Sequence, residues 1–104
     1  MAFTRGTTPV YSITFSELSL SDLSDVYITF EQKKSGYELT KHGTDLTWDY
    51  ANNKVQCVLS QAETLKFASG DIKVQIRAID SAQMATATEI LEDTVNDVLY
   101  EAVI

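Results

Sequence analysis

Apolar and polar residues alternate with a period of two in several short segments of this chain, and residues typical of turns separate these segments. In residues 71–78, Ile72, Val74, Ile76 and Ala78 fall on one side of an extended backbone, and polar residues fall on the other. A helix would instead repeat its apolar positions every three to four residues. The alternation therefore predicts a protein built mainly from half-buried β-strands.

The same pattern predicts further strands. Their alternating apolar residues are Tyr11, Ile13 and Phe15; Val26, Ile28 and Phe30; Tyr37 and Leu39; Leu46, Trp48 and Tyr50; and Val55, Cys57 and Leu59. The first strand is expected over residues 8–16, and Pro9 suits the start of an edge strand because it donates no ladder hydrogen bond. Asn52 and Asn53 favour a tight hairpin turn, since Asn accepts left-handed backbone conformations.

Two connecting segments depart from the period of two. Residues 17–25 are rich in Ser and Asp and are expected to form a loop with a helical turn. Ser60 and Glu63 have the spacing of a capping box, Ala62 and Leu65 are spaced for one helical face, and Gly70 can end the turn. A short helix is therefore predicted over residues 61–68, crossing between two sheets.

The last part of the chain fits two patterns. A strand over residues 84–95 is preferred, because β-branched residues are frequent there and a sandwich needs a closing edge strand. A helical stripe is the alternative, and its residues are Leu91, Val95, Val98, Leu99 and Ala102. Residues 97–104 are apolar enough to dock on the body of the protein or on another subunit.

Taken together, the segments predict an all-β fold, namely a two-sheet antiparallel immunoglobulin-like sandwich of six to seven strands with one short helical crossing near residues 61–68. The 104 residues, 44% of them hydrophobic, suit one domain over residues 1–104 with a single core. Cys57 is the only cysteine, so neither an internal disulfide nor a paired-cysteine zinc site can form.

The charge balance limits the partners. Fifteen acidic residues against eight basic ones give a net charge of −7, which would repel nucleic acid. No apolar stretch reaches the roughly 20 residues needed to cross a membrane, and residues 1–6 lack the apolar run of a signal peptide. We expect a chain that is cytoplasmic when produced, binds neither nucleic acid nor membranes, and leaves the cell only as part of an assembly.

The inventory of reactive side chains is short. His42 is the single histidine and lies in an expected turn, while Cys57 is expected to be an inert core thiol. Asp45 and Asp49 point the same way on one strand but are about 13 Å apart by strand rise, too far to act as a pair. Residues 22–25 match no calcium loop, and the four glycines are isolated turn residues. No catalytic, cofactor-binding or metal-binding residue is predicted.

Three aromatic residues could form a platform for sugar rings, namely Tyr37, Trp48 and Tyr50. Their shared parity instead favours packing in the core.

Several segments resemble a known group of proteins. These segments are residues 4–9, the alternating residues 11–15, and residues 23–30, 55–67 and 98–104. They look like parts of small proteins encoded in the tail gene regions of phages and prophages of Gram-positive bacteria. More distantly, the pattern resembles the N-terminal domain of the phage baseplate upper protein family. The resemblance implies a structural role in a tail or baseplate, with no catalytic residues to carry over.

The sequence therefore predicts a non-enzymatic structural or assembly module. Its contacts with other phage tail or baseplate proteins, or with itself, would use exposed strand edges near Pro9 and Thr86 and the apolar residues 97–104. A carbohydrate-binding module with an aromatic platform is the alternative. An enzyme is the third hypothesis, and it would require acidic residues to gather around His42 in a pocket.

Overall fold

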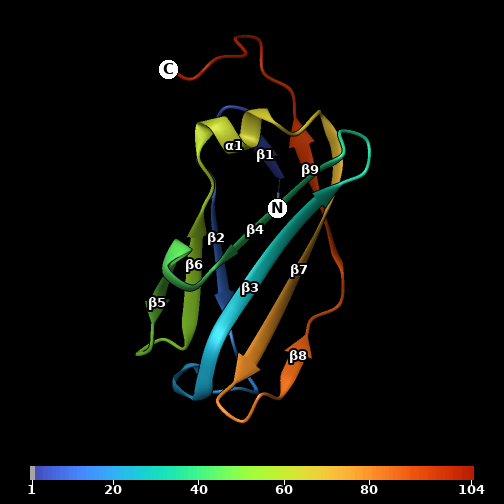
Figure 1. Cartoon of the computed structure of the whole chain (residues 1–104). Coiled ribbons are helices and arrows are strands. Elements are labelled where there is room, and N and C mark those ends of the chain that lie inside the picture. Colours follow the sequence, from blue (N-terminus) through green and yellow to red (C-terminus); the bar gives the residue numbers. More distant parts are fainter. Residues whose placement is uncertain (1) are drawn as a thin grey trace.

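The computed structural model describes residues 2–104, and two β-sheets pack face to face in it to form a β-sandwich (Figure 1). The elements in chain order are β1 (Ala2–Thr4), β2 (Val10–Thr14), the 3-10 turn η1 (Leu20–Asp22), β3 (Leu23–Gln32), β4 (Tyr37–His42), the 3-10 turn η2 (Gly43–Asp45), β5 (Leu46–Asp49), β6 (Lys54–Val58), α1 (Gln61–Leu65), β7 (Gly70–Asp80), β8 (Ala85–Ala87) and β9 (Leu91–Asn96).

The larger sheet has the strand order β1-β9-β7-β3-β4, and β8 also pairs with β7. Its two longest strands, β3 and β7, run antiparallel and place Ile28 opposite Ile76 in the middle of the sheet. The smaller sheet has the order β2-β6-β5 and is antiparallel throughout. The sandwich predicted from the alternation is therefore confirmed.

The core lies between the two sheets and consists mostly of side chains that the alternation places inward, together with Phe3, Leu20 and Phe67 from outside the predicted strands. Its buried apolar residues are Phe3, Leu20, Val26, Ile28, Phe30, Leu46, Val55, Cys57, Leu59, Phe67, Ile72, Val74, Ile76, Ala78 and Val95. Tyr11 adds a polar link, because its hydroxyl donates to Asp93 Oδ2 at 2.7 Å. The apolar residues that were predicted to face inward from β3, β6 and β7 are all buried.

The strand plan differs from the prediction in three respects. Residues 2–104 form nine strands rather than six or seven, because β1 was not expected and the segment 84–95 is split into β8 and β9. The first strand, β1, runs parallel to β9, so the larger sheet is mixed rather than purely antiparallel. The helical stripe considered for the last part of the chain does not form, since Leu91–Asn96 is a strand.

The predicted helix is present but shorter than residues 61–68. The capping box of Ser60 and Glu63 is confirmed, with the Ser60 hydroxyl accepting from Glu63 N at 3.1 Å. The face that Ala62 and Leu65 share is not the buried one, because the buried residue of the helix is Thr64. The Thr64 hydroxyl accepts from Gly6 N and donates to Thr7 O, both at 2.9 Å, so this buried face is held by polar contacts.

The molecule is elongated, with extents of 45 × 25 × 19 Å. Figure 1 shows β1, α1 and the C-terminal residues at one end, and η1 and the turn between β7 and β8 at the other. Within residues 2–104, no helix is both long enough and apolar enough to span a membrane.

Candidate protein-contact surfaces

The sandwich is open along one side, where β2 and β8 face each other as edge strands. Among the described residues, β2 pairs with β6 alone and β8 pairs with β7 alone. These are the edges that the sequence placed near Pro9 and Thr86, so both edge positions are confirmed.

The outer edge of β2 presents backbone groups that its sheet does not use. Phe15 N donates to Asn53 O at 2.9 Å, and Leu59 N donates to Pro9 O at 3.1 Å. In an antiparallel pair, such bonded residues alternate with residues whose N–H and C=O point away from the neighbouring strand. Ser12 and Thr14 therefore point their backbone groups away from β6, towards the open side.

The same reasoning applies to β8. Thr88 N donates to Ile76 O at 2.9 Å, and Asp80 N donates to Met84 O at 3.1 Å. The alternation then leaves the backbone groups of Ala85 and Ala87 pointing away from β7. This edge is shorter than that of β2, because β8 has only three residues.

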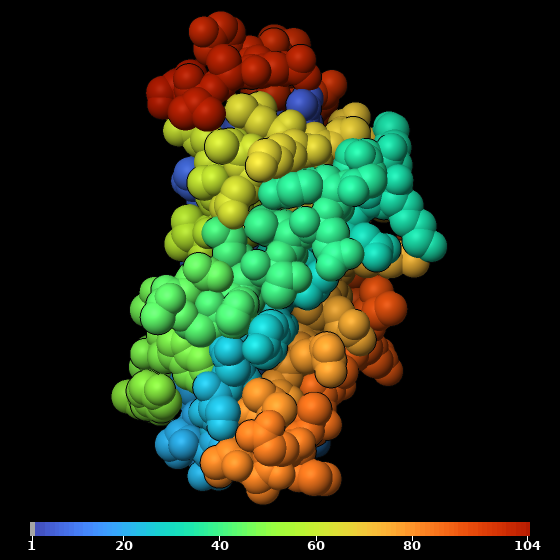
Figure 2. Space-filling view, in the orientation of Figure 1, coloured from blue at the N-terminus to red at the C-terminus, as the bar shows by residue number. Residues whose placement is uncertain are grey.

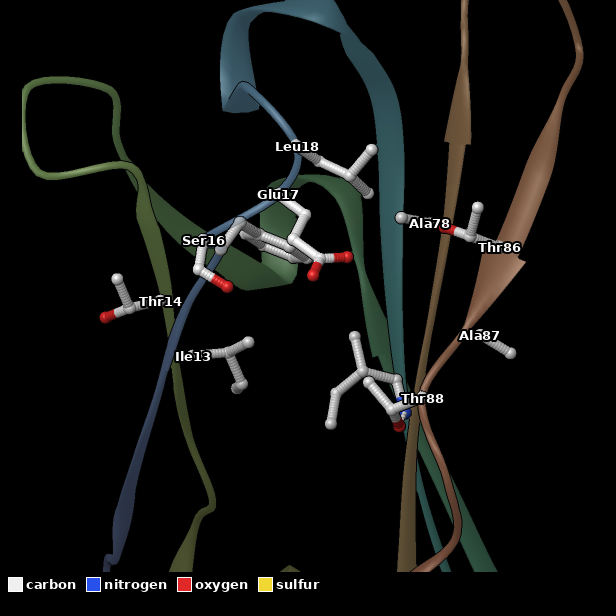
Figure 3. A pocket seen from close by; sticks show the side chains of 11 residues that line it. Ile13, Thr14, Ser16, Glu17, Leu18, Ala78, Thr86, Ala87 and Thr88 are labelled. Carbon is white, nitrogen blue, oxygen red and sulfur yellow. Dashed lines mark hydrogen bonds between the residues drawn. The ribbon is translucent and has the colours of Figure 1, made fainter.

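A groove of about 420 Å³ separates the two edges (Figure 3). We call it the seam groove, and its lining residues are Ile13, Thr14, Phe15, Ser16, Glu17, Leu18, Ile76, Ala78, Thr86, Ala87 and Thr88. Ile76 and Ala78 form its buried floor, and Figure 3 shows Ile13 and Leu18 projecting into the space from the β2 side. The groove is thus an apolar trough with an unused strand edge on each side.

One end of the seam groove is acidic. A smaller hollow of about 180 Å³ adjoins it and shares Glu17, Leu18 and Thr86 with it. The walls of this hollow also include Asp22 and Asp80, and none of the eight basic residues of the chain lines either space. We call this hollow the acidic end of the groove.

Asn53 holds the loop that forms one wall of the groove. Its backbone is left-handed, with φ of +54°, as predicted for the hairpin turn. Its side-chain amide donates to Phe15 O and to Leu18 O, and its oxygen accepts from Leu20 N at 2.6 Å. One side chain from the turn between β5 and β6 therefore fixes the path of the chain from β2 to η1.

The C-terminal residues form a second surface, at the opposite end of the molecule (Figure 2). Arg5 forms ion pairs with Asp97, at 2.8 Å, and with Glu101, and Ile104 N donates to Gln61 Oε1 at 2.9 Å. Two interactions hold the pKa of Asp97 below its usual range: the larger is the hydrogen bond from the backbone N–H of Val98, and the smaller is the hydrogen bond from Arg5. Residues 97–104 therefore dock on the body of the protein, which is one of the two arrangements expected from the sequence; the other was docking on another subunit.

Docking leaves the apolar side chains of this segment in contact with solvent. Leu99, Tyr100, Val103 and Ile104 are each more than half exposed. The polar contacts thus hold the segment in place without burying its apolar residues.

His42 lies at the surface, as expected, but it is the last residue of β4 rather than part of the turn in which it was predicted. Its Nδ1 is 2.9 Å from Asp25 Oδ2, its ring stacks on Tyr27 with centroids 4.5 Å apart, and its side chain is 48% exposed. Burial raises the pKa of Asp25, but hydrogen bonds from His42 and from the backbone of Val26 and Gly43 outweigh it, so the net shift is downward. These contacts fasten the turn that follows β4.

Cys57 is fully buried on β6, in the position predicted for a core thiol. Burial raises the pKa of this thiol to about 11. The thiolate, which is the nucleophilic form, is therefore scarce at neutral pH.

The structure does not bring the candidate carboxylates together. Asp45 Oδ2 accepts from His42 N at 3.3 Å, whereas Asp49 bonds to Asn52 at the far end of β5. Within residues 2–104, no group of three or more His, Cys, Asp and Glu side chains is arranged to hold a metal ion, and this includes residues 22–25.

The three candidate aromatic residues separate into two places. Trp48 and Tyr50 stack with centroids 6.1 Å apart and an interplanar angle of 25°, while Tyr37 packs against Phe67. The prediction that all three face the core is wrong for Tyr50, which is 61% exposed because β5 ends at Asp49. Trp48 is half-buried, and its indole N–H donates to Gly43 O at 3.0 Å.

Comparisons with known proteins establish the fold and leave the family open. No family model matches the chain, and no curated protein matches it. Among solved structures, it is similar to part of a "putative glycoside hydrolase from Bacteroides vulgatus ATCC 8482", with a TM-score of 0.55 and 12% sequence identity. The alignment covers 93% of this chain but only 16% of that one, so the chain spans a small part of that protein. At this identity the likeness concerns the β-sandwich fold alone.

Proposed function

We propose that this chain is a non-enzymatic structural or assembly module that acts through protein–protein contacts in a phage or prophage tail or baseplate. The observation that carries the proposal is the seam groove, an apolar trough of about 420 Å³ between two unused strand edges. Exposed edges are places where a further chain can add by main-chain hydrogen bonding. The phage context is supported by the sequence resemblance described above.

The exposed C-terminal residues support the same proposal. Large apolar side chains in contact with solvent mark surfaces that another protein can cover. Leu99 and Ile104 are 104% and 90% exposed, yet Arg5 and Gln61 hold their segment on the body. Such an ordered apolar surface offers a contact at the end of the molecule opposite the acidic end of the groove.

The test is assembly with the products of the neighbouring genes. Each product is co-expressed with this chain, and the complexes are measured by size-exclusion chromatography with light scattering. We expect a stable complex of defined stoichiometry with at least one product, or a defined oligomer of this chain. A monomer at millimolar concentration that binds none of these proteins would refute the proposal.

A carbohydrate-binding module is a second candidate, because Trp48 and the exposed Tyr50 present stacked rings at the surface. A glycan array followed by a tryptophan fluorescence titration tests it. Binding through these rings would change Trp48 fluorescence and would be lost in Tyr50→Ala. An unchanged spectrum with every array ligand would eliminate this candidate.

A further inference from the structure

We infer that the seam groove takes an extended segment of another protein, with apolar residues at alternate positions and a lysine or arginine at the end that lies over the acidic end of the groove. The segment adds as a fourth strand to the smaller sheet, alongside β2. This inference rests on the proposed function and specifies the partner of the same surface.

The strand edge decides where the segment pairs. β2 has five residues and turns the backbone groups of Ser12 and Thr14 outward, whereas β8 has three residues. A longer edge gives more main-chain hydrogen bonds to an incoming strand. Pairing along β2 also extends the sheet over the open side of the core.

The position of the groove explains why the bound segment should have apolar residues at every second position. Side chains of a strand point alternately to its two faces, so every second residue of a strand beside β2 would point between the sheets. There it would meet Ile13 and Phe15 from β2, and Ile76 and Ala78 from the floor of the groove. A space of about 420 Å³ lies within the usual size range of ligand pockets. Apolar side chains at these positions would complete the core.

The charge decides between a second copy and a different protein. Glu17, Asp22 and Asp80 line the acidic end, and no basic residue of this chain lines it or the seam groove. A second copy of the chain carries a net charge of −7, so like charges would meet. A basic residue at one end of the partner segment would instead be attracted.

The experiment uses the full chain and synthetic peptides of eight residues. The test peptides alternate valine and threonine and carry two lysines at either the N-terminal or the C-terminal end. The matched peptides carry two glutamates instead, and a third set has proline in place of the central threonine. Binding is followed by amide chemical shifts, which also locate the peptide on the protein.

We expect one lysine peptide to bind and to shift the amides of Ser12, Thr14 and Ala87 most. The glutamate and proline peptides should bind at least about tenfold more weakly, through charge repulsion and loss of a main-chain hydrogen bond respectively. Raising the salt concentration should reduce the preference for lysine.

Variants of the edge provide the control. Ser12→Pro removes an outward N–H that β6 does not use, so the fold should be kept while the peptide binds at least about tenfold more weakly. Ser12→Ala keeps this N–H and should bind like the wild type. Glu17→Gln should reduce the preference for lysine, whereas Glu38→Gln on β4, with the same change of charge, should not.

The outcomes separate the inference from the proposed function. If no peptide binds, or if the shifts map away from β2, the inference is wrong. It is also wrong if Ser12→Pro binds like Ser12→Ala, or if the chain self-associates through this edge without peptide. The proposed function survives each of these results if the chain still assembles with products of neighbouring genes, and it fails if no assembly of any kind is found.

Discussion

Asn53 should be one of the most sensitive surface positions of this protein. Its side chain makes three hydrogen bonds, to Phe15 O, Leu18 O and Leu20 N, and its backbone is left-handed. Each bond contributes about 1 kcal/mol, so Asn53→Gly should lower the free energy of unfolding by about 2–4 kcal/mol. Glycine keeps the backbone conformation at no steric cost, whereas Asn53→Ala should cost a further 1 kcal/mol or so.

Urea unfolding monitored by circular dichroism measures these changes. With a slope near 1.5 kcal/mol per molar urea, Asn53→Gly should lower the midpoint by roughly 2 M. Asn52→Ala is the matched control, because Asn52 is exposed and contacts only its own turn, and it should change the free energy by under about 0.5 kcal/mol. The reasoning is refuted if Asn53→Gly is as stable as the wild type, or if Asn53→Ala is the milder of the two substitutions.

Three further predictions concern the core and the helix. The Cys57 thiol should react with a thiol reagent at pH 8 only after unfolding, since its pKa is raised to about 11 and its side chain is buried; rapid labelling of the folded chain would contradict this. Phe30→Ala should lower the free energy of unfolding by about 3–5 kcal/mol, measured by urea unfolding, because Phe30 is fully buried; a loss under 1 kcal/mol would show a loose core. Burial raises the pKa of Glu63, but Lys41 at 2.8 Å and the Ser60 N–H outweigh it and lower the pKa overall. At pH 7 the wild type should therefore be about 1 kcal/mol more stable to unfolding than Glu63→Gln. This extra stability should be fully present above about pH 4.3, the pKa of Glu63 in the unfolded chain, and should disappear as the pH falls through the lower pKa of Glu63 in the folded protein. A stability difference between the two proteins that does not change with pH would refute the prediction.

Much of the sandwich follows from local pattern. Ile72, Val74, Ile76 and Ala78 alternate, and because a strand buries every second residue, their burial follows directly. The same rule fails at Tyr50, because a parity argument holds only while the strand continues and β5 ends one residue earlier. The limits of a strand depend on its partners, which a local pattern does not contain.

Features that depend on distant contacts were harder to predict. β1 has only three residues, which is too short for an alternating pattern to indicate a strand. It forms a strand because it pairs with the edge of β9. Thr64 is buried in a helix because Gly6 and Thr7 satisfy its hydroxyl, which the helical pattern of Ala62 and Leu65 could not indicate.

The candidate site was predicted in part. Pro9 and Thr86 correctly indicated the two edges, since Pro9 directly precedes β2, Thr86 lies within β8, and each of these strands has one free side. The groove between them was not predicted, because its lining combines residues 13–18 with Ile76, Ala78 and residues 86–88 and depends on how the sheets are spaced. The acidic end joins Glu17 and Asp22 with Asp80 for the same reason.

The parallel pairing of β1 with β9 has a consequence for how the chain acquires its structure. Ala2 pairs with Thr94, so β1 cannot pair with its neighbour until the chain has been synthesised as far as β9. Closing so large a loop is entropically costly, and contacts of such high sequence separation slow the folding reaction. The hairpin of β3 and β4 can form early, whereas the N-terminal strand should be among the last parts to become protected from hydrogen exchange during refolding.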